Sequence, residues 1–198
     1  MLLLGLDTAG TTLDLALADA GEIVVRRSFA ERRGQSEALL PLLQSALRQA
    51  GREMRDIAAI AVVTGPGSFT GLRLGLAAAE GLSRALGCPV GGFDRFSLIR
   101  NHVKADKLAI ILESLRAELF AEFESGQPLM LMAENIAARL DESWQLAGDG
   151  VSRLGKEGVS LPSGADMVAL AAHDVLSRGD VLSPARPFYL RAPDVTLI

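Results

Sequence analysis

The spacing of apolar residues divides the chain into short strands and helices. Residues 2–6 form an uninterrupted apolar run that is typical of a buried strand. Residues 13–17 alternate apolar and polar positions, and residues 23–29 resemble a further strand. A tight turn at 19–22 joins the last two runs. The chain is therefore predicted to open with a three-stranded meander.

A helical period replaces this alternation at residues 36–50. Apolar residues recur on one face, and Pro41 predicts a helix start at about 38–40, because proline is tolerated only in the first turn. A β-branched strand follows at 57–63. Ser68 is then placed to cap a long helix, 69–86, which Gly87 ends. Residues 90–92 predict a strand, and Asp94 begins a helix to about residue 101.

The second half begins at a polar stretch, residues 104–107. Beyond it the pattern predicts further elements: paired strands at 108–112 and 118–123, a helix at 133–140, a strand at 144–147, a helix at 167–176 and a terminal strand at 187–190. We therefore expect two lobes, 1–103 and a smaller 104–198. The order three strands, helix, strand, helix is that of one half of an α/β, actin/Hsp70-like (ASKHA, ribonuclease H-like) two-lobe fold, with the second lobe reduced.

Composition narrows the functional classes. The 198 residues are 49% hydrophobic with a net charge of -4, and no apolar run is long enough for a membrane span. One cysteine excludes a disulfide framework, and the charge lacks the basic footprint of an autonomous nucleic-acid binder. We expect a cytoplasmic protein without a membrane segment.

Few residues could carry chemistry. Asp7 and Thr8 end the first strand and are candidates for a vestigial nucleotide site, although their side chains could equally bond the hairpin's own backbone. The strand-to-helix turn at 65–73 is not a phosphate loop, because Leu72 follows Gly71 where that motif needs lysine. No metal-ligand motif is visible, so we expect no catalytic residue, metal or cofactor.

The helix at 69–86 carries small residues at every fourth position. Such a stripe lets another backbone approach closely, either the chain's own sheet or a helix of a second subunit. The helix ending at residue 50 offers an apolar row beside it. The predicted subunit interface comprises Leu39, Leu43, Leu47, Gly71, Leu72, Gly75, Leu76 and Ala79.

Several segments resemble the TsaB (YeaZ) family over the whole chain. Residues 61–76, Ala-Val-Val-Thr-Gly-Pro-Gly-Ser-Phe-Thr-Gly-Leu-Arg-Leu-Gly-Leu, are similar to its glycine-rich signature nearly throughout, and residues 4–8, 35–42, 113–120 and 187–195 resemble its other motifs. Gln35 stands in place of the family's usual His, Ala9-Gly10 in place of Ser-Thr, and Leu115 in place of Arg.

The resemblance implies a subunit without chemistry of its own in the synthesis of threonylcarbamoyladenosine on tRNA. It implies pairing through first-lobe helices with a TsaD-type transferase, which a TsaE-type ATPase joins. It also implies contact with tRNA only through that complex, and a homodimer when the chain is alone. Two other functions stay open: an actin-fold nucleotide-dependent ATPase or phosphotransferase, and a glycoprotease-like peptidase.

Overall fold

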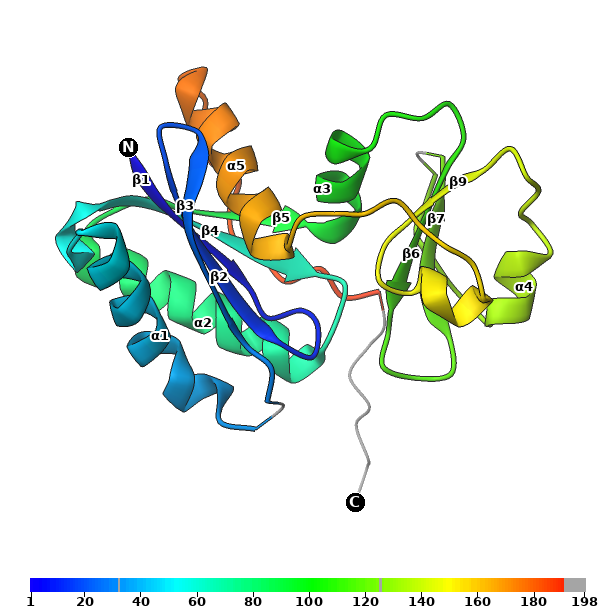
Figure 1. Cartoon of the computed structure of the whole chain (residues 1–198), viewed down its shortest axis with the longest axis horizontal. Helices are drawn as coiled ribbons and strands as arrows, with labels where there is room; N and C mark the ends of the chain where they lie inside the picture. The colour runs from blue at the N-terminus through cyan, green and yellow to red at the C-terminus, as the bar shows by residue number, and fades with distance from the viewer. Residues whose placement is uncertain (32, 125, 191–198) are drawn as a thin grey trace.

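The structure is a computed structural model, and it describes residues 1–31, 33–124 and 126–190. Two separate β-sheets organise the chain (Figure 1). The first has the order β3-β2-β1-β4-β5. Its strands are β1 (Leu2–Asp7), β2 (Leu13–Asp19), β3 (Glu22–Phe29), β4 (Ile57–Gly65) and β5 (Val90–Asp94). The β1–β3 meander is antiparallel, whereas β4 lies parallel to both β1 and β5.

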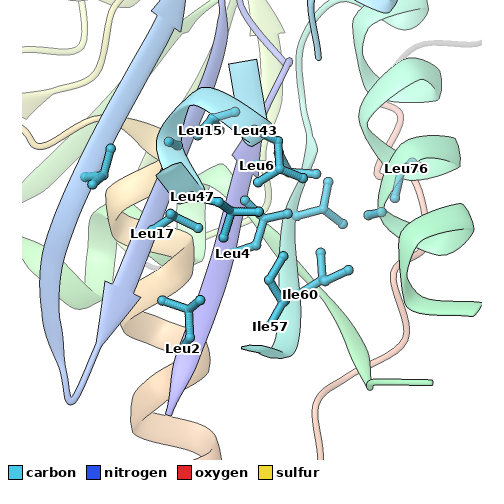
Figure 2. Packing of buried hydrophobic residues seen from close by; sticks show 14 residues of the cluster. Leu2, Leu4, Leu6, Leu15, Leu17, Leu43, Leu47, Ile57, Ile60 and Leu76 are labelled. Atoms are coloured by element: carbon cyan, nitrogen blue, oxygen red, sulfur yellow. The ribbon is translucent and has the colours of Figure 1, made fainter. Parts of the chain in front are cut away.

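Helices cover both faces of the first sheet. Helices α1 (Gln35–Ala50) and α2 (Phe69–Leu86) lie on one face, and α5 (Gly164–Ser177) lies on the other (Figure 1). The α1 and α2 side contains a leucine-rich core (Figure 2). The labelled side chains there are Leu2, Leu4, Leu6, Leu15, Leu17, Leu43, Leu47, Ile57, Ile60 and Leu76. The α5 side is built from smaller residues, which allows that helix to approach the sheet closely.

The second sheet is smaller and has the order β8-β7-β6-β9. Its strands are β6 (Leu108–Glu113), β7 (Leu119–Phe123), β8 (Leu129–Leu131) and β9 (Gln145–Ala147). The remaining helical segments are α3 (Arg95–His102), α4 (Ala133–Ala137) and the 3-10 turns η1 (Met54–Asp56) and η2 (Val151–Leu154). Apolar residues of α3 pack against β6, so this helix joins the two halves of the molecule.

The predicted strands and helices of the first 103 residues are confirmed, including the Ser68 and Asp94 caps. One boundary is wrong: α1 begins at Gln35, so Pro41 lies inside the helix and not in its first turn. Pro41 cannot donate to the carbonyl of Glu37, but both residues are exposed, so that carbonyl is open to solvent. The helix therefore continues through the proline.

The second half departs further from expectation. The short strand β8 was not predicted, and α4 ends at Ala137, before the expected residue 140. The terminal strand expected at 187–190 is wrong. That segment makes a single backbone hydrogen bond to β4, from Phe188 N to Thr64 O, and Pro187 has no N–H for a ladder. Residues 191–195 of the family's closing segment lie outside the described residues.

The polar stretch at 104–107 joins the two sheets, but the chain does not stay in the second one. Helix α5 returns to pack on β1, β2 and β4 of the first sheet. Residues 182–190 then run along the β5 edge of the same sheet, where Gly92 N donates to Ser183 O. The division at residue 103 stays a prediction for the two lobes. Within 104–198, helix α5 and residues 182–190 contact the first sheet.

Candidate functional site

Asp7 ends β1 and faces the start of α5. Its Oδ1 accepts a hydrogen bond from Ala9 N at 2.8 Å. A Cβ placed on Gly164 would lie 1.8 Å from Oδ2, so only glycine fits at this first residue of α5. Burial raises the pKa of the Asp7 carboxyl above its ordinary value of 3.8, and the charge of Arg95 opposes part of that shift. The first turn of a helix favours a nearby negative charge. Asp7 therefore lies packed against the N-terminus of α5.

Thr8 is fully buried between β1 and α2. Its Oγ1 donates to the carbonyl of Gly71 at 2.7 Å. A Cβ on Gly71 would lie 2.0 Å from the Thr8 carbonyl oxygen, and one on Gly75 would lie 2.3 Å from Thr8 Oγ1. The glycine stripe thus lets α2 pack directly on the loop after β1. Of the two alternatives for the stripe, the structure shows the first: the stripe packs on the chain's own β1 and the loop after it.

All eight residues of the predicted subunit interface lie in the interior of the chain. Their helical spacing was read correctly, but it marks the faces of α1 and α2 that pack on the chain's own sheet and on the loop after β1. They are not available at the surface in this structure. A subunit contact through these two helices stays a prediction, and other residues of the same helices would have to make it.

The outer sides of α1 and α2 carry those other residues. On α1, Leu40 is 49% exposed and is followed by the exposed Pro41. On α2, Ala77 is exposed, and a Cβ on Gly81 would meet nothing within 4 Å. We call the exposed residues of the two helices the outer helix face: Ser36, Glu37, Leu40, Pro41, Gln44, Arg48, Gln49, Thr70, Arg73, Ala77, Glu80, Gly81, Arg84 and Ala85. This surface combines small and apolar residues with a few charges.

A cavity of about 290 Å³ separates α3 and α5 from the turn after β9. Asp7 lines it together with the apolar Leu98, Ile99 and Met167. Its charges are largely paired with one another, since Arg95 Nη2 lies 2.9 Å from Asp149 Oδ2. The cavity combines this ion pair with mainly apolar walls.

The Gly148-Asp149-Gly150 turn beside this cavity has a structural role. Asp149 Oδ1 accepts a hydrogen bond from Glu113 N at 2.9 Å, at the end of β6. A Cβ on Gly148 would lie 2.2 Å from the Ile111 carbonyl oxygen, so the turn fits against β6 only with glycine at that position. This turn connects the second sheet to α3 through Arg95.

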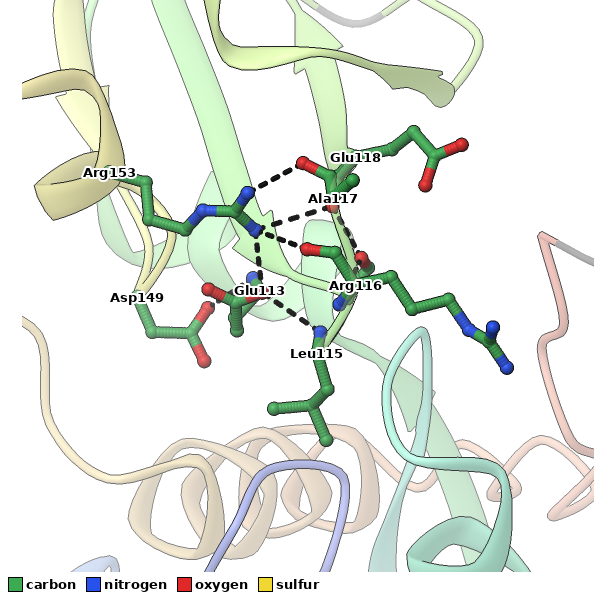
Figure 3. Close-up of polar contacts among 8 residues, drawn as sticks. Glu113, Leu115, Arg116, Ala117, Glu118, Asp149 and Arg153 are labelled. Carbon is green, nitrogen blue, oxygen red and sulfur yellow. Dashed lines mark hydrogen bonds and ion pairs between the residues drawn. The ribbon is translucent and has the colours of Figure 1, made fainter.

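Arg153 organises the tip of the β6–β7 hairpin (Figure 3). Its guanidinium donates to the carbonyl oxygens of Arg116 at 2.7 Å and Ala117 at 2.5 Å, and to the Glu113 carboxylate at 3.0 Å. Leu115 is held at φ 62° at the tip and is 39% exposed. No local pattern in the sequence points to Arg153 or Arg95, because their partners are distant along the chain.

Among the described residues, no group of three or more His, Cys, Asp or Glu side chains could hold a metal ion. Within the same residues, no helix is both long and apolar enough to cross a membrane.

Fold comparisons define the class of protein first. The activator of 2-hydroxyisocaproyl-CoA dehydratase from Clostridium difficile, solved with bound ADPNP, superimposes with a TM-score of 0.60 at 14% identity over 90% of this chain and 97% of its own. YeaZ from Pseudomonas aeruginosa gives a TM-score of 0.74 at 26% identity, covering 96% of this chain and 99% of that one. The expected α/β, actin-like fold is confirmed.

Sequence comparisons define the family. An uncharacterized protein of Mycobacterium tuberculosis is 32% identical, covering 96% of this chain and 92% of its own. The tRNA threonylcarbamoyladenosine biosynthesis protein TsaB of Escherichia coli is 28% identical over 96% of this chain and 95% of its own. A family described as "TsaD: tRNA N6-adenosine threonylcarbamoyltransferase" matches residues 29–122. The chain belongs to the TsaB (YeaZ) family.

Proposed function

We propose that this chain is a non-catalytic partner subunit in the biosynthesis of threonylcarbamoyladenosine on tRNA. Its relatives of that name support the pathway. The similarity of residues 29–122 to the TsaD-type transferase supports that enzyme as the partner, since two chains with related first lobes can pair through equivalent helices.

The observation that carries the non-catalytic role is the packing of Asp7 against the start of α5. The space beside Oδ2 holds the backbone of Gly164, with less than 2 Å to a Cβ position. Thr8 is likewise fully buried, with its hydroxyl bonded to Gly71. On the side of Oδ2 that Gly164 covers, a phosphate group would need the space that the first turn of α5 takes. The two candidate nucleotide-site residues therefore serve the packing of α5 and α2.

The outer helix face supports the pairing. It belongs to two neighbouring helices, and its small residues Ala77 and Gly81 would let a partner helix approach closely. Leu40 provides exposed apolar area at its edge. A stable contact of two helices on each side would bury about 1,200–2,000 Å² in total. The same face would serve a homodimer when the chain is alone, and it would be the contact that a TsaD-type partner displaces.

The other parts of the proposal follow from the complex. The chain would act in the cytoplasm, where tRNA is modified, and would contact tRNA only through its partner. A TsaE-type ATPase would supply the nucleotide hydrolysis.

Mixing purified chain with a TsaD-type subunit tests the proposal. We expect a 1:1 complex by size-exclusion chromatography with light scattering, and tRNA threonylcarbamoylation only when both subunits are present. The chain alone is expected to hydrolyse no ATP. ATP hydrolysis by the chain alone that Asp7→Asn abolishes, at unchanged stability, would contradict the non-catalytic role.

A matched pair of variants tests the surface. Leu40→Arg and Val24→Arg each place a charge at a half-exposed apolar position, with exposed fractions of 49% and 47%. Leu40 lies on the outer helix face, whereas Val24 lies on the edge strand β3. We expect Leu40→Arg to weaken the complex at least about tenfold by leaving a charge in an apolar contact, and Val24→Arg to leave it unchanged. Equal binding by both variants places the contact elsewhere.

A further inference from the structure

The C-terminal segment 182–190 is bound along the edge of the first sheet (Figure 1). Leu182 is 7% exposed, and a Cβ on Gly91 would lie 2.6 Å from its Cβ. Farther along, a Cβ on Gly65 would lie 2.7 Å from the Phe188 carbonyl oxygen. Glycines of β5 and β4 therefore make room for this segment, which is as closely packed as a strand without forming one.

This segment ends beside the first turn of α2. The rings of Tyr189 and Phe69 have centroids 5.2 Å apart, and Tyr189 stays 37% exposed. The guanidinium of Arg73, one turn later on α2, lies 3.8 Å from the centroid of the Phe69 ring. The three side chains form a stack, which we call the Arg73 stack: Tyr189, Phe69 and Arg73.

Arg73 has a geometry suited to an anion. An arginine stacked on a ring uses the face of its guanidinium and leaves the N–H groups at its edge for hydrogen bonds. Within residues 1–31, 33–124 and 126–190, no carboxylate lies in ion-pair distance of Arg73. By contrast Arg84, on the same helix, has Glu80 at 4.0 Å. Arg73 is therefore held in place by aromatic contact while its charge stays available at the surface.

We propose that the Arg73 stack is the anchor that binds a carboxylate of the partner subunit, an inference that rests on the proposed function. The occupant is an Asp or Glu side chain on the partner, paired with the edge of the guanidinium through two hydrogen bonds. Arginine and tyrosine are the residue types that dominate binding energy at interfaces, and an arginine already held on a ring loses little freedom on binding. Arg73 belongs to the outer helix face, so the C-terminal segment contributes to the contact through Tyr189.

The test measures the dissociation constant of the complex by isothermal titration calorimetry with Arg73→Ala, Arg73→Glu and Tyr189→Ala. Arg139→Ala and Arg139→Glu are the controls, because Arg139 is exposed, lies over the Phe123 ring and is outside the outer helix face. Circular dichroism checks the fold of each variant. We expect Arg73→Ala to weaken binding about tenfold to a hundredfold, and Arg73→Glu to weaken it further, because it places two negative charges together. Tyr189→Ala should weaken it less than Arg73→Ala, and the Arg139 variants should bind within about twofold of the unchanged chain.

The outcomes separate this inference from the function on which it rests. If the unchanged chain forms no complex, the proposed function fails. If it forms the complex and folded Arg73→Ala binds as tightly, only the carboxylate anchor is overturned. Equal losses for Arg73→Ala and Arg73→Glu also overturn it, since a facing carboxylate would repel the glutamate. A loss with Tyr189→Ala alone shows an apolar contact and overturns the role of Arg73.

Discussion

Replacing Gly71 by alanine tests how α2 is packed. The added methyl group would lie 2.0 Å from the carbonyl oxygen of Thr8 and 3.2 Å from the carbonyl carbon. Both atoms belong to the backbone, so α2 or the loop after β1 would have to shift. That shift would also disturb the hydrogen bond from Thr8 Oγ1 to Gly71 O. The substitution is small, but the structure leaves it no space.

The magnitude follows from three contributions. Overpacking of a buried site costs about 1–3 kcal/mol, and loss of the buried hydrogen bond costs about 1 kcal/mol. Alanine in place of glycine within a helix returns about 1 kcal/mol. We therefore expect Gly71→Ala to lower the free energy of unfolding by about 1–3 kcal/mol.

Gly81→Ala is the control in the same helix. A Cβ there would meet nothing within 4 Å, so only the helix propensity changes. We expect that variant to gain about 0.5–1 kcal/mol. The two variants should then differ by about 2–4 kcal/mol in urea denaturation followed by circular dichroism. If Gly71→Ala is stabilised as much as Gly81→Ala, the stripe does not face the loop after β1 and would be open to a second subunit.

Three further predictions concern single side chains. Glu122 is 3% exposed, and burial raises the pKa of its carboxyl above 4.5. Its contribution to the unfolding free energy is therefore fully present below that pH and declines as the pH rises through the folded-state pKa. Glu122→Gln should flatten this part of the pH profile of the unfolding free energy. Arg153→Lys should lower the free energy of unfolding by about 1–3 kcal/mol and speed hydrogen exchange at the β6–β7 tip, because lysine cannot reach several carbonyls at once. Unchanged exchange would argue against the described contacts. Ser163→Ala removes the acceptor for Asp166 N at the start of α5 and should cost about 1 kcal/mol in thermal or urea unfolding, whereas no change would mean that the cap contributes nothing.

The first lobe was predictable because its signals are local. Residues 69–86 have a serine cap before them and a glycine after them, and the helix occupies the predicted span. Apolar runs gave β1 and β4 for the same reason. The elements of the second half depend on contacts between residues that are distant in the sequence, so a local pattern does not show them. The three-residue strand β8 is too short to show a period, and residues 187–190 are held by a single hydrogen bond to β4 and by packing of Phe188 and Leu190 against α3 and the second sheet.

The direction of the glycine stripe could not be predicted at all. A stripe of Gly71, Gly75 and Ala79 has the same spacing whether it meets a sheet or another subunit. The deciding partner, Thr8, lies 63 residues before Gly71 in the sequence. The same limit applied to Asp7, whose neighbour Gly164 comes from the far end of the chain. Periodicity identifies a face that must be covered, whereas only the tertiary structure says what covers it.

Asp7 and Thr8 show why residues at a familiar position need not keep a familiar chemistry. On the side of Asp7 that Gly164 covers, a phosphate could bind only if α5, which begins at Gly164, moved away from the sheet. That helix buries Val168 and three alanines against the sheet. Exposing one valine and three alanine methyl groups would cost about 4–5 kcal/mol at about 0.8 kcal/mol for each methyl group and at least about 1.5 kcal/mol for the valine. A cost of that size weakens a ligand about a thousandfold. The packing of α5 therefore opposes nucleotide binding at Asp7 from that side, which agrees with the non-catalytic role that we propose.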